Sequence, residues 1–357
     1  MKRYYYWLDT YRFMSAFLVV LTHARFWFFQ PYGLLEDDSK NVFTLVLFFL
    51  SSLGRDAVVA FFILSGFLVG GRTIEKLIVG EHVSPTSFAA SRIVRIIVPL
   101  AAVLLINALF NVIQGNPNDW WRIIGNLLCL QGAFVNPEPG IGVLWTMSYI
   151  VWFYVLIWSF VLMAQKKTST IWGGITSLTI TLWVFAHMGG SLIYVLQVSC
   201  GILSYFLSKS NFGKWALWTS IVAAVMVTGL CRLSGESLSF QALPLDILLL
   251  RTLQTISYAV VIGLSVQHAP KSSQAVWIEK TMSKLSKFSY SLYLVHLPIV
   301  MMMVYLGVER LPYVNLFSLS LYVGGILICM ISAWLIYVLI ENPSNKLKVK
   351  ILNKIEK

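Results

Sequence analysis

The chain has 357 residues, of which 58% are hydrophobic and 12% are charged, and its net charge is +12. Soluble globular proteins average ~45–50% apolar and ~25% charged residues, so this composition excludes a soluble enzyme, a disordered chain and a coiled coil. The apolar residues form runs close to the ~20 residues that cross a bilayer as a helix, not the ~10-residue alternating segments of a membrane barrel. The sequence therefore predicts an all-α polytopic integral membrane protein.

Apolar runs with charged flanks predict about ten membrane spans. In chain order, their approximate ranges are 7–29, 57–72, 93–113, 144–164, 170–187, 192–208, 215–231, 249–267, 288–307 and 316–340. Two further apolar stretches, 41–53 and 120–135, are too short to add a crossing, and we expect outer-surface or re-entrant helices that cover a cavity. Residues 1–343 are expected to form one transmembrane domain, followed by a basic cytoplasmic tail over 344–357.

The distribution of charge predicts the orientation, because cytoplasmic loops of membrane proteins collect Lys and Arg. With the N-terminus inside, 20 of the 27 Lys and Arg but only 6 of the 15 Asp and Glu fall on the inner side. The opposite orientation would place this basic excess outside. Both termini are therefore expected to be cytoplasmic.

The first predicted span contains two candidate functional residues, Arg12 and His23. Their separation of eleven residues places both on one face of a helix, about 16 Å apart along its axis. Ionisable groups within a bilayer are costly and are therefore candidates for a function. This face suits an extended ligand with an anionic head that enters from the inner side. The alternatives are a positive-inside anchor for Arg12 and a hydrogen-bonded packing residue for His23.

Arg92 and Arg95 lie just before the third predicted span, three residues apart, and therefore share a helix face. Guanidinium groups can bind phosphate oxygens in a bidentate way that Lys does not match. The pair is a candidate phosphate site at the inner membrane surface. An anchor that contacts lipid head groups is the alternative.

Five further polar residues in the predicted spans are candidates for lining a pore or binding an acceptor. They are Ser65, Tyr149, Tyr290, Tyr293 and His296. The small Ser65-Gly66 pair allows a helix or a ligand to approach closely, and helix packing is the favoured interpretation. Tyr149 belongs to an aromatic cluster that also suits an interface belt. For His296, a pore role and packing hydrogen bonds beside Pro298 are equally consistent.

No metal site is predicted, because the sequence has no pair of His residues four apart and no carboxylate–histidine cluster with ligand spacing. Phosphate-binding loops and G-x-S-x-G nucleophile motifs are also absent from the sequence. Catalysis, if any, is then expected to use the intramembrane polar residues.

Six motifs, in order along the chain, resemble those of the acyltransferase-3 family of membrane-bound acyltransferases. The most specific is Arg-x10-His, met by Arg12 and His23 in LDTYRFMSAFLVVLTHARF. The others are FFILSGFL (61–68), the Arg-x-x-Arg of Arg92 and Arg95, LWTMSYIVWFY (144–154), FSYSLYLVHLP (288–298) and Glu341-Asn342-Pro343. One position departs from the pattern, because many relatives carry a glutamate where this chain has Ile150 or Val151.

The resemblance implies transfer of an acyl group, most often acetyl, from cytoplasmic acyl-CoA to a glycan hydroxyl in a bacterial inner membrane. On this basis Arg12, Arg92 and Arg95 are expected to bind acyl-CoA. His23 is expected to act as general base on the acceptor or as the first acyl acceptor. Any role of the missing glutamate is absent or supplied elsewhere.

The expected partners are acetyl-CoA as co-substrate, a surface polysaccharide or its lipid-linked precursor as acceptor, and the bilayer, with no metal and no nucleic acid. A transporter or flippase for a lipid-linked sugar or a small anion is the main alternative, although no inverted repeat is apparent. A non-catalytic scaffold for polysaccharide assembly is a third interpretation.

Overall fold

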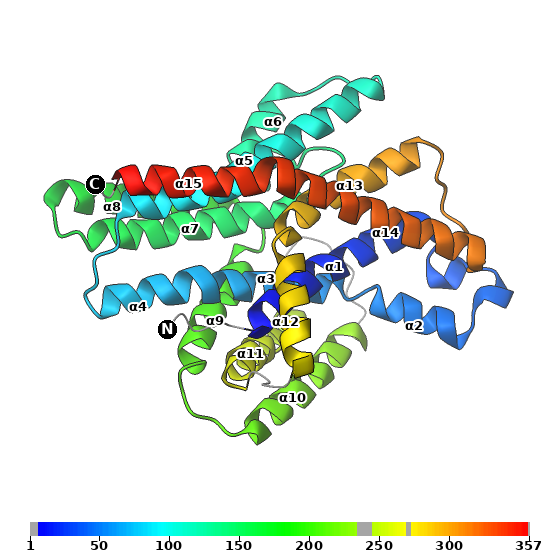
Figure 1. The fold of residues 1–357 in the computed structure, drawn as a ribbon, viewed down its shortest axis with the longest axis horizontal. Helices are drawn as coiled ribbons and strands as arrows, with labels where there is room; N and C mark the ends of the chain where they lie inside the picture. Colours follow the sequence, from blue (N-terminus) through cyan, green and yellow to red (C-terminus); the bar gives the residue numbers. More distant parts are fainter. Residues whose placement is uncertain (1–5, 234–244, 269–272, 356–357) are drawn as a thin grey trace.

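The structure is a computed structural model that describes residues 6–233, 245–268 and 273–355. Within these ranges the chain is helical, without β-strands beyond isolated bridges such as Phe29 with Leu311, as predicted. The helices are α1 (Tyr6–Phe28), α2 (Val42–Leu50), α3 (Gly54–Ser65), α4 (Arg72–Ile78), α5 (Pro85–Ile113), α6 (Trp120–Leu127), α7 (Trp145–Met163), α8 (Thr168–His187), α9 (Ser191–Leu207), α10 (Lys214–Leu233), α11 (Leu245–Gln267), α12 (Ser273–Ser286), α13 (Ser289–Tyr305), α14 (Leu316–Ile336) and α15 (Asn342–Ile355). Figure 1 shows their arrangement.

Each of the ten predicted spans is occupied by a helix, but fewer helices meet the length and hydropathy expected of a membrane crossing. Seven do so in the described ranges, and an eighth is added if α12 and α13, which meet at a bend of 55°, form one span. Helix α9 has only 17 residues, and α1 carries Asp9 and Arg25 in its terminal turns. The short stretches at 41–53 and 120–135 form helices of 9 and 8 residues, so neither adds a crossing of its own.

Helix α1 packs against α3, α11, α12, α13 and α14. Its residues Ala16, Val20 and Ala24 are fully buried, and their spacing of four places them in one stripe along the helix. On the opposite side of α1, the Thr22 hydroxyl donates to Ser51 O (2.6 Å) and accepts from Gly54 N (2.9 Å). The turn between α2 and α3 is therefore fixed against α1, one residue before His23.

Backbone contact between α3 and α9 depends on glycine. A Cβ added to Gly66 would overlap Val198 O, and one added to Gly201 would overlap Ile63 O. Gly66 also begins a π-helical turn, η3 (Gly66–Gly71), which joins α3 to α4. Gly66 therefore serves helix packing, the interpretation that the sequence favoured for the Ser65-Gly66 pair.

An ion-pair network joins α3 to α10 and α11. Asp56 is 4% exposed and accepts from Arg232, while Gln254 Nε2 donates to its Oδ1 (2.8 Å). Arg251 lies 3.9 Å from the same carboxylate. A buried carboxylate needs such partners, because an unpaired charge inside a protein is strongly unfavourable.

The C-terminal residues continue the last span. Helix α14 passes through a second π-helical turn, η5 (Tyr337–Glu341), into α15 without a break, and α15 packs against α5 (Figure 1). The basic tail predicted from residue 344 is thus helical through Ile355 and extends α14.

Replacing Gly201 with Ala is expected to destabilise the protein by about 1–3 kcal/mol or more, because the added methyl group meets the backbone of α3. Gly229→Ala on α10 is the matched control, since an added Cβ there has no neighbour within 4 Å. Thermal unfolding of both variants in detergent measures the difference. Equal unfolding midpoints would show that the α3–α9 contact is looser than described.

Candidate functional site

A cavity of about 380 Å³ lies between α1, α3, η3, α5, α7 and α13. The apolar part of its wall includes Phe61, Leu64, Leu68 and Ile150. Its polar lining consists of Arg12, Ser65, Arg72, Arg92, Arg95, Thr146, Tyr154, Ser289, Tyr290 and Tyr293. We call it the arginine cavity.

Four arginines from three helices give this cavity its charge. Arg12 lies 3.6 Å from Asp9, and Glu341 acts electrostatically on both Arg12 and Arg95. Neither carboxylate belongs to the cavity lining, in which Arg12, Arg92 and Arg95 are partly exposed and Arg72 is exposed. Since like charges repel each other, an anionic ligand would lower the electrostatic energy of this arrangement.

Arg72 and Glu341 were not among the site residues predicted from the sequence. Arg72 begins α4 and reads as a positive-inside anchor, and only the packing of η3 places it at the cavity. Glu341 ends η5, is 3% exposed and accepts from Ser291 Oγ on α13 (2.6 Å). The Glu-Asn-Pro motif was its only signal in the sequence.

His23 and His296 form a hydrogen-bonded pair. His23 Nδ1 lies 2.9 Å from His296 Nε2, and the two rings stack with centroids 5.1 Å apart. His296 is fully buried, and its Nδ1 lies 3.1 Å from Leu292 O one turn earlier in α13. Of the two interpretations of His296, the structure supports hydrogen bonding between helices.

The hydrogen bonds of this pair define which nitrogens carry protons. A carbonyl oxygen can only accept, so the proton of neutral His296 lies on Nδ1 and its Nε2 carries a lone pair. That lone pair accepts from His23, whose proton is then on Nδ1. His23 Nε2 is left unprotonated and has no hydrogen-bond partner among the described residues. A neutral imidazole in this state is a general base.

Tyr293 connects the arginine cavity with the histidine pair. It lines the cavity, its ring is 6.0 Å from that of His296, and Phe61 packs against it at 5.3 Å. Its hydroxyl lies 2.7 Å from Thr146 Oγ1 and donates to Val143 O at 2.9 Å. Neither histidine is part of the cavity lining, so Phe61 and Tyr293 stand at the end of the cavity nearest the pair.

The structure brings most of the predicted site residues together. Arg12, Ser65, Arg92, Arg95, Tyr290 and Tyr293 all line the arginine cavity, and the Tyr290 hydroxyl donates to Ile96 O (3.0 Å). Tyr149 does not line it. Its hydroxyl donates to Gly189 O, and its ring packs against Tyr194 at 4.4 Å, so Tyr149 packs α7 against α9.

Ile150 lines the arginine cavity and is buried. Ile150 or Val151 is the residue at which the fourth-span motif departs from the glutamate noted in the sequence analysis. The cavity wall is therefore apolar at Ile150. Glu341 is a buried carboxylate whose charge acts on those of Arg12 and Arg95, and it lies on η5 instead of α7.

No group of three or more His, Cys, Asp or Glu side chains that could hold a metal ion occurs in the part of the chain that the structure describes.

Comparison with known protein families matches residues 5–338 to a family described as an acyltransferase domain, Acyl_transf_3. No curated protein matches the chain. No solved structure matches it either. The family match covers α1 to the second π-helical turn and therefore includes both the arginine cavity and the histidine pair.

Removing the Glu341 carboxylate is expected to destabilise the protein more than removing its hydrogen-bond donor. Glu341→Ala removes a carboxylate whose charge acts on Arg12 and Arg95 and leaves Asp9 as the ion-pair partner of Arg12, which is expected to cost roughly 1.5–3 kcal/mol. Ser291→Ala removes one hydrogen bond and is expected to cost about 1 kcal/mol. Thermal unfolding in detergent compares the two. A larger loss in Ser291→Ala would contradict the electrostatic role of Glu341.

Proposed function

The chain belongs to the acyltransferase-3 family and is a multi-pass membrane acyltransferase, and we propose that its acyl donor is cytoplasmic acyl-CoA, most often acetyl-CoA. The acceptor is a hydroxyl group of a cell-surface polysaccharide or of its lipid-linked precursor, at the outer face of a bacterial inner membrane. One observation carries this proposal: α1 places Arg12 in the arginine cavity and, eleven residues later, the hydrogen-bonded imidazole of His23.

The arginine cavity suits the donor. Acyl-CoA carries phosphates at one end and a thioester at the other, joined by a long pantetheine arm. Arg12, Arg72, Arg92 and Arg95 hold the phosphates, because guanidinium groups bind phosphate oxygens in a bidentate way. The pantetheine arm follows the wall of α3 toward Phe61. Arg12 and His23 are about 16 Å apart along α1, and the segment from Phe61 to Arg72, which includes the π-helical turn η3, lines the cavity beside them.

His23 supplies the base for the chemical step. Its Nε2 takes the proton from the acceptor hydroxyl, and the hydroxyl oxygen attacks the thioester carbonyl carbon. The carbon–sulfur bond then breaks, and the leaving thiolate of CoA receives the proton from His23. His296 accepts from His23 Nδ1 throughout, which keeps Nε2 directed at the reacting groups. In the alternative order, His23 Nε2 attacks the thioester carbonyl carbon and CoA leaves as the thiolate. The acceptor oxygen then takes the acyl group from Nε2, and its proton passes by way of Nε2 to the thiolate.

Phe61 and Tyr293 separate the two halves of this site. The thioester must pass these side chains to reach His23, because neither histidine lines the arginine cavity. The aromatic pair thus separates the cytoplasmic donor from the acceptor side when no donor is bound. Such separation limits loss of the acyl group to water.

Replacing His23 with Ala is expected to lower acyl transfer by at least about 100-fold, because general acid–base catalysis contributes 10²–10⁴-fold, while acetyl-CoA binding is retained. The measurement is release of CoA thiol by the purified protein with an acceptor, together with NMR of acetyl groups on surface glycans. The matched control is His187→Ala, since His187 is exposed and its hydrogen bond, to Trp183 O, lies within α8. Transfer at the wild-type rate in His23→Ala would refute both orders of the mechanism.

The His296 variants separate positioning from packing. His296→Ala should lower kcat and alter the pH–rate profile, because the tautomer of His23 is no longer fixed. His296→Gln can still accept from His23 Nδ1 through its amide oxygen and should recover part of the activity. Equal activities of the two variants would remove the positioning role of His296.

Replacing Arg95 with Gln is expected to weaken acetyl-CoA binding by about 10- to 100-fold, in line with the loss of one charge-assisted hydrogen bond. Calorimetry on the purified protein measures the affinity directly. Arg122→Gln is the control, because Arg122 lies on α6 and pairs with Asp119 away from the cavity. Unchanged affinity in Arg95→Gln would refute the donor site.

A purified protein that moves a lipid-linked sugar or an anion without releasing CoA thiol would be a transporter.

A further inference from the structure

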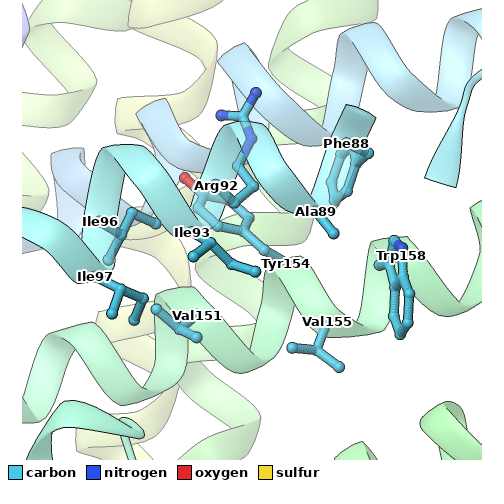
Figure 2. A pocket seen from close by; sticks show the side chains of 10 residues that line it. All are labelled: Phe88, Ala89, Arg92, Ile93, Ile96, Ile97, Val151, Tyr154, Val155 and Trp158. Atoms are coloured by element: carbon cyan, nitrogen blue, oxygen red, sulfur yellow. The ribbon is translucent and has the colours of Figure 1, made fainter. Parts of the chain in front are cut away.

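A second cavity of about 260 Å³ lies between α5 and α7, on the side of α5 that carries Ile93 (Figure 2). Ala89, Ile93 and Ile97 line it from α5, and Val151 and Val155 line it from α7. Ile93 is 55% exposed, so the cleft opens on the outer surface of the bundle. In a membrane, that surface faces the hydrocarbon chains of lipids.

Arg92 lies at one edge of this apolar cleft. Its guanidinium carbon is 5.6 Å from the centre of the Phe88 ring and 5.7 Å from that of Tyr154. Figure 2 shows the guanidinium group pointing away from the apolar side chains. Its Nε is buried and makes no hydrogen bond within the described ranges. Lys348 is not part of the cleft lining; it lies on α15, which packs against α5, and its charge acts on those of Arg92 and Arg95.

The cleft runs along α5 from Phe88 to Ile97, nine residues or about 14 Å apart, and the Arg92 side chain lies between these ends. Trp158 lies at the end of the cleft near the start of α5 and donates to Pro85 O (2.9 Å). Tryptophan with its N–H bonded and its ring in an apolar wall is typical of a membrane interface.

We propose that this cleft binds one hydrocarbon chain of an anionic phospholipid, with the lipid phosphate held by Arg92 and Lys348. Basic pockets between transmembrane helices bind anionic head groups. Each basic side chain raises the affinity for an anionic lipid about fivefold over that for a neutral lipid. The lining between the helices is apolar apart from Arg92 and Tyr154. The hydrocarbon chain of the lipid therefore packs against this lining, and the negative charge of its phosphate pairs with the basic side chains. A free anion would leave the apolar cleft unfilled.

Arg92 lines both cavities, so the lipid phosphate and the proposed donor share this one side chain. The test therefore measures lipid binding alone and uses only variants outside the proposed catalytic and donor residues. The probes are dioleoyl-phosphatidylglycerol, dioleoyl-phosphatidylcholine and inorganic phosphate, added to the full-length protein in detergent. Native mass spectrometry counts the bound lipids, and the thermal midpoint reports their effect on stability. Wild-type protein is expected to retain phosphatidylglycerol at least tenfold more tightly than phosphatidylcholine, and phosphate should not displace it.

Ala89→Phe fills the cleft and should weaken phosphatidylglycerol binding about tenfold. The matched control Ala223→Phe places the same ring on an exposed face of α10 and should bind as the wild type does. Lys348→Gln leaves the cleft intact and should lower the affinity for phosphatidylglycerol about fivefold without changing that for phosphatidylcholine. Equal binding of the two lipids by the wild type, undiminished binding by Ala89→Phe, or displacement by phosphate would each overturn the proposal.

Discussion

A polar group on a helix within a bilayer needs a partner on its own helix or on another one, and α1 carries two groups, Arg12 and His23, with partners on other helices. Arg12 and His23 lie on one helix face, where water is scarce and a charge costs ~2.5–3.5 kcal/mol on insertion scales. Arg12 is compensated by Asp9 and by the charge of Glu341, and His23 is compensated by His296. These two sets of contacts decide which helices surround α1, because each partner has to be brought to a fixed depth.

Helix α13 meets both requirements with seven consecutive residues. Tyr290 lines the arginine cavity, Ser291 holds Glu341, Tyr293 ends the cavity and His296 pairs with His23. Residues 289, 293 and 296 share one face of a helix, so the cavity and the histidine pair are lined by the same stripe of side chains. A shift of α13 along α1 would disturb both sites together. This coupling gives the proposed reaction a fixed distance between the donor phosphates and the base.

The sequence could predict what depends on one helix and not what depends on two. The spacing of Arg12 and His23, and that of Arg92 and Arg95, follow from helical periodicity alone. The partner of His23 lies 273 residues away, and Arg72 reaches the cavity only through the glycine contact between η3 and α9. Tyr149 misled because α7 is apolar around its whole circumference, so that periodicity does not show which aromatic faces the cavity. Against about ten predicted spans, seven helices in the described ranges, or eight with the bent α12–α13 pair, have the length and hydropathy of a crossing; α9 has only 17 residues.

Ile150 has a consequence for the chemistry that the proposed function requires. A carboxylate at this position would neutralise one arginine of the cavity and would offer a second base near the donor. With Ile150 in its place, the described lining of the cavity contains no carboxylate, and in the proposed mechanism the arginines hold the donor phosphates while His23 takes the proton of the acceptor. The imidazolium formed at His23 has His296, also neutral, as its partner and lacks the counter-ion that would trap the proton. Its proton therefore passes readily to the leaving thiolate, which is the step that a general base must complete before the next turnover.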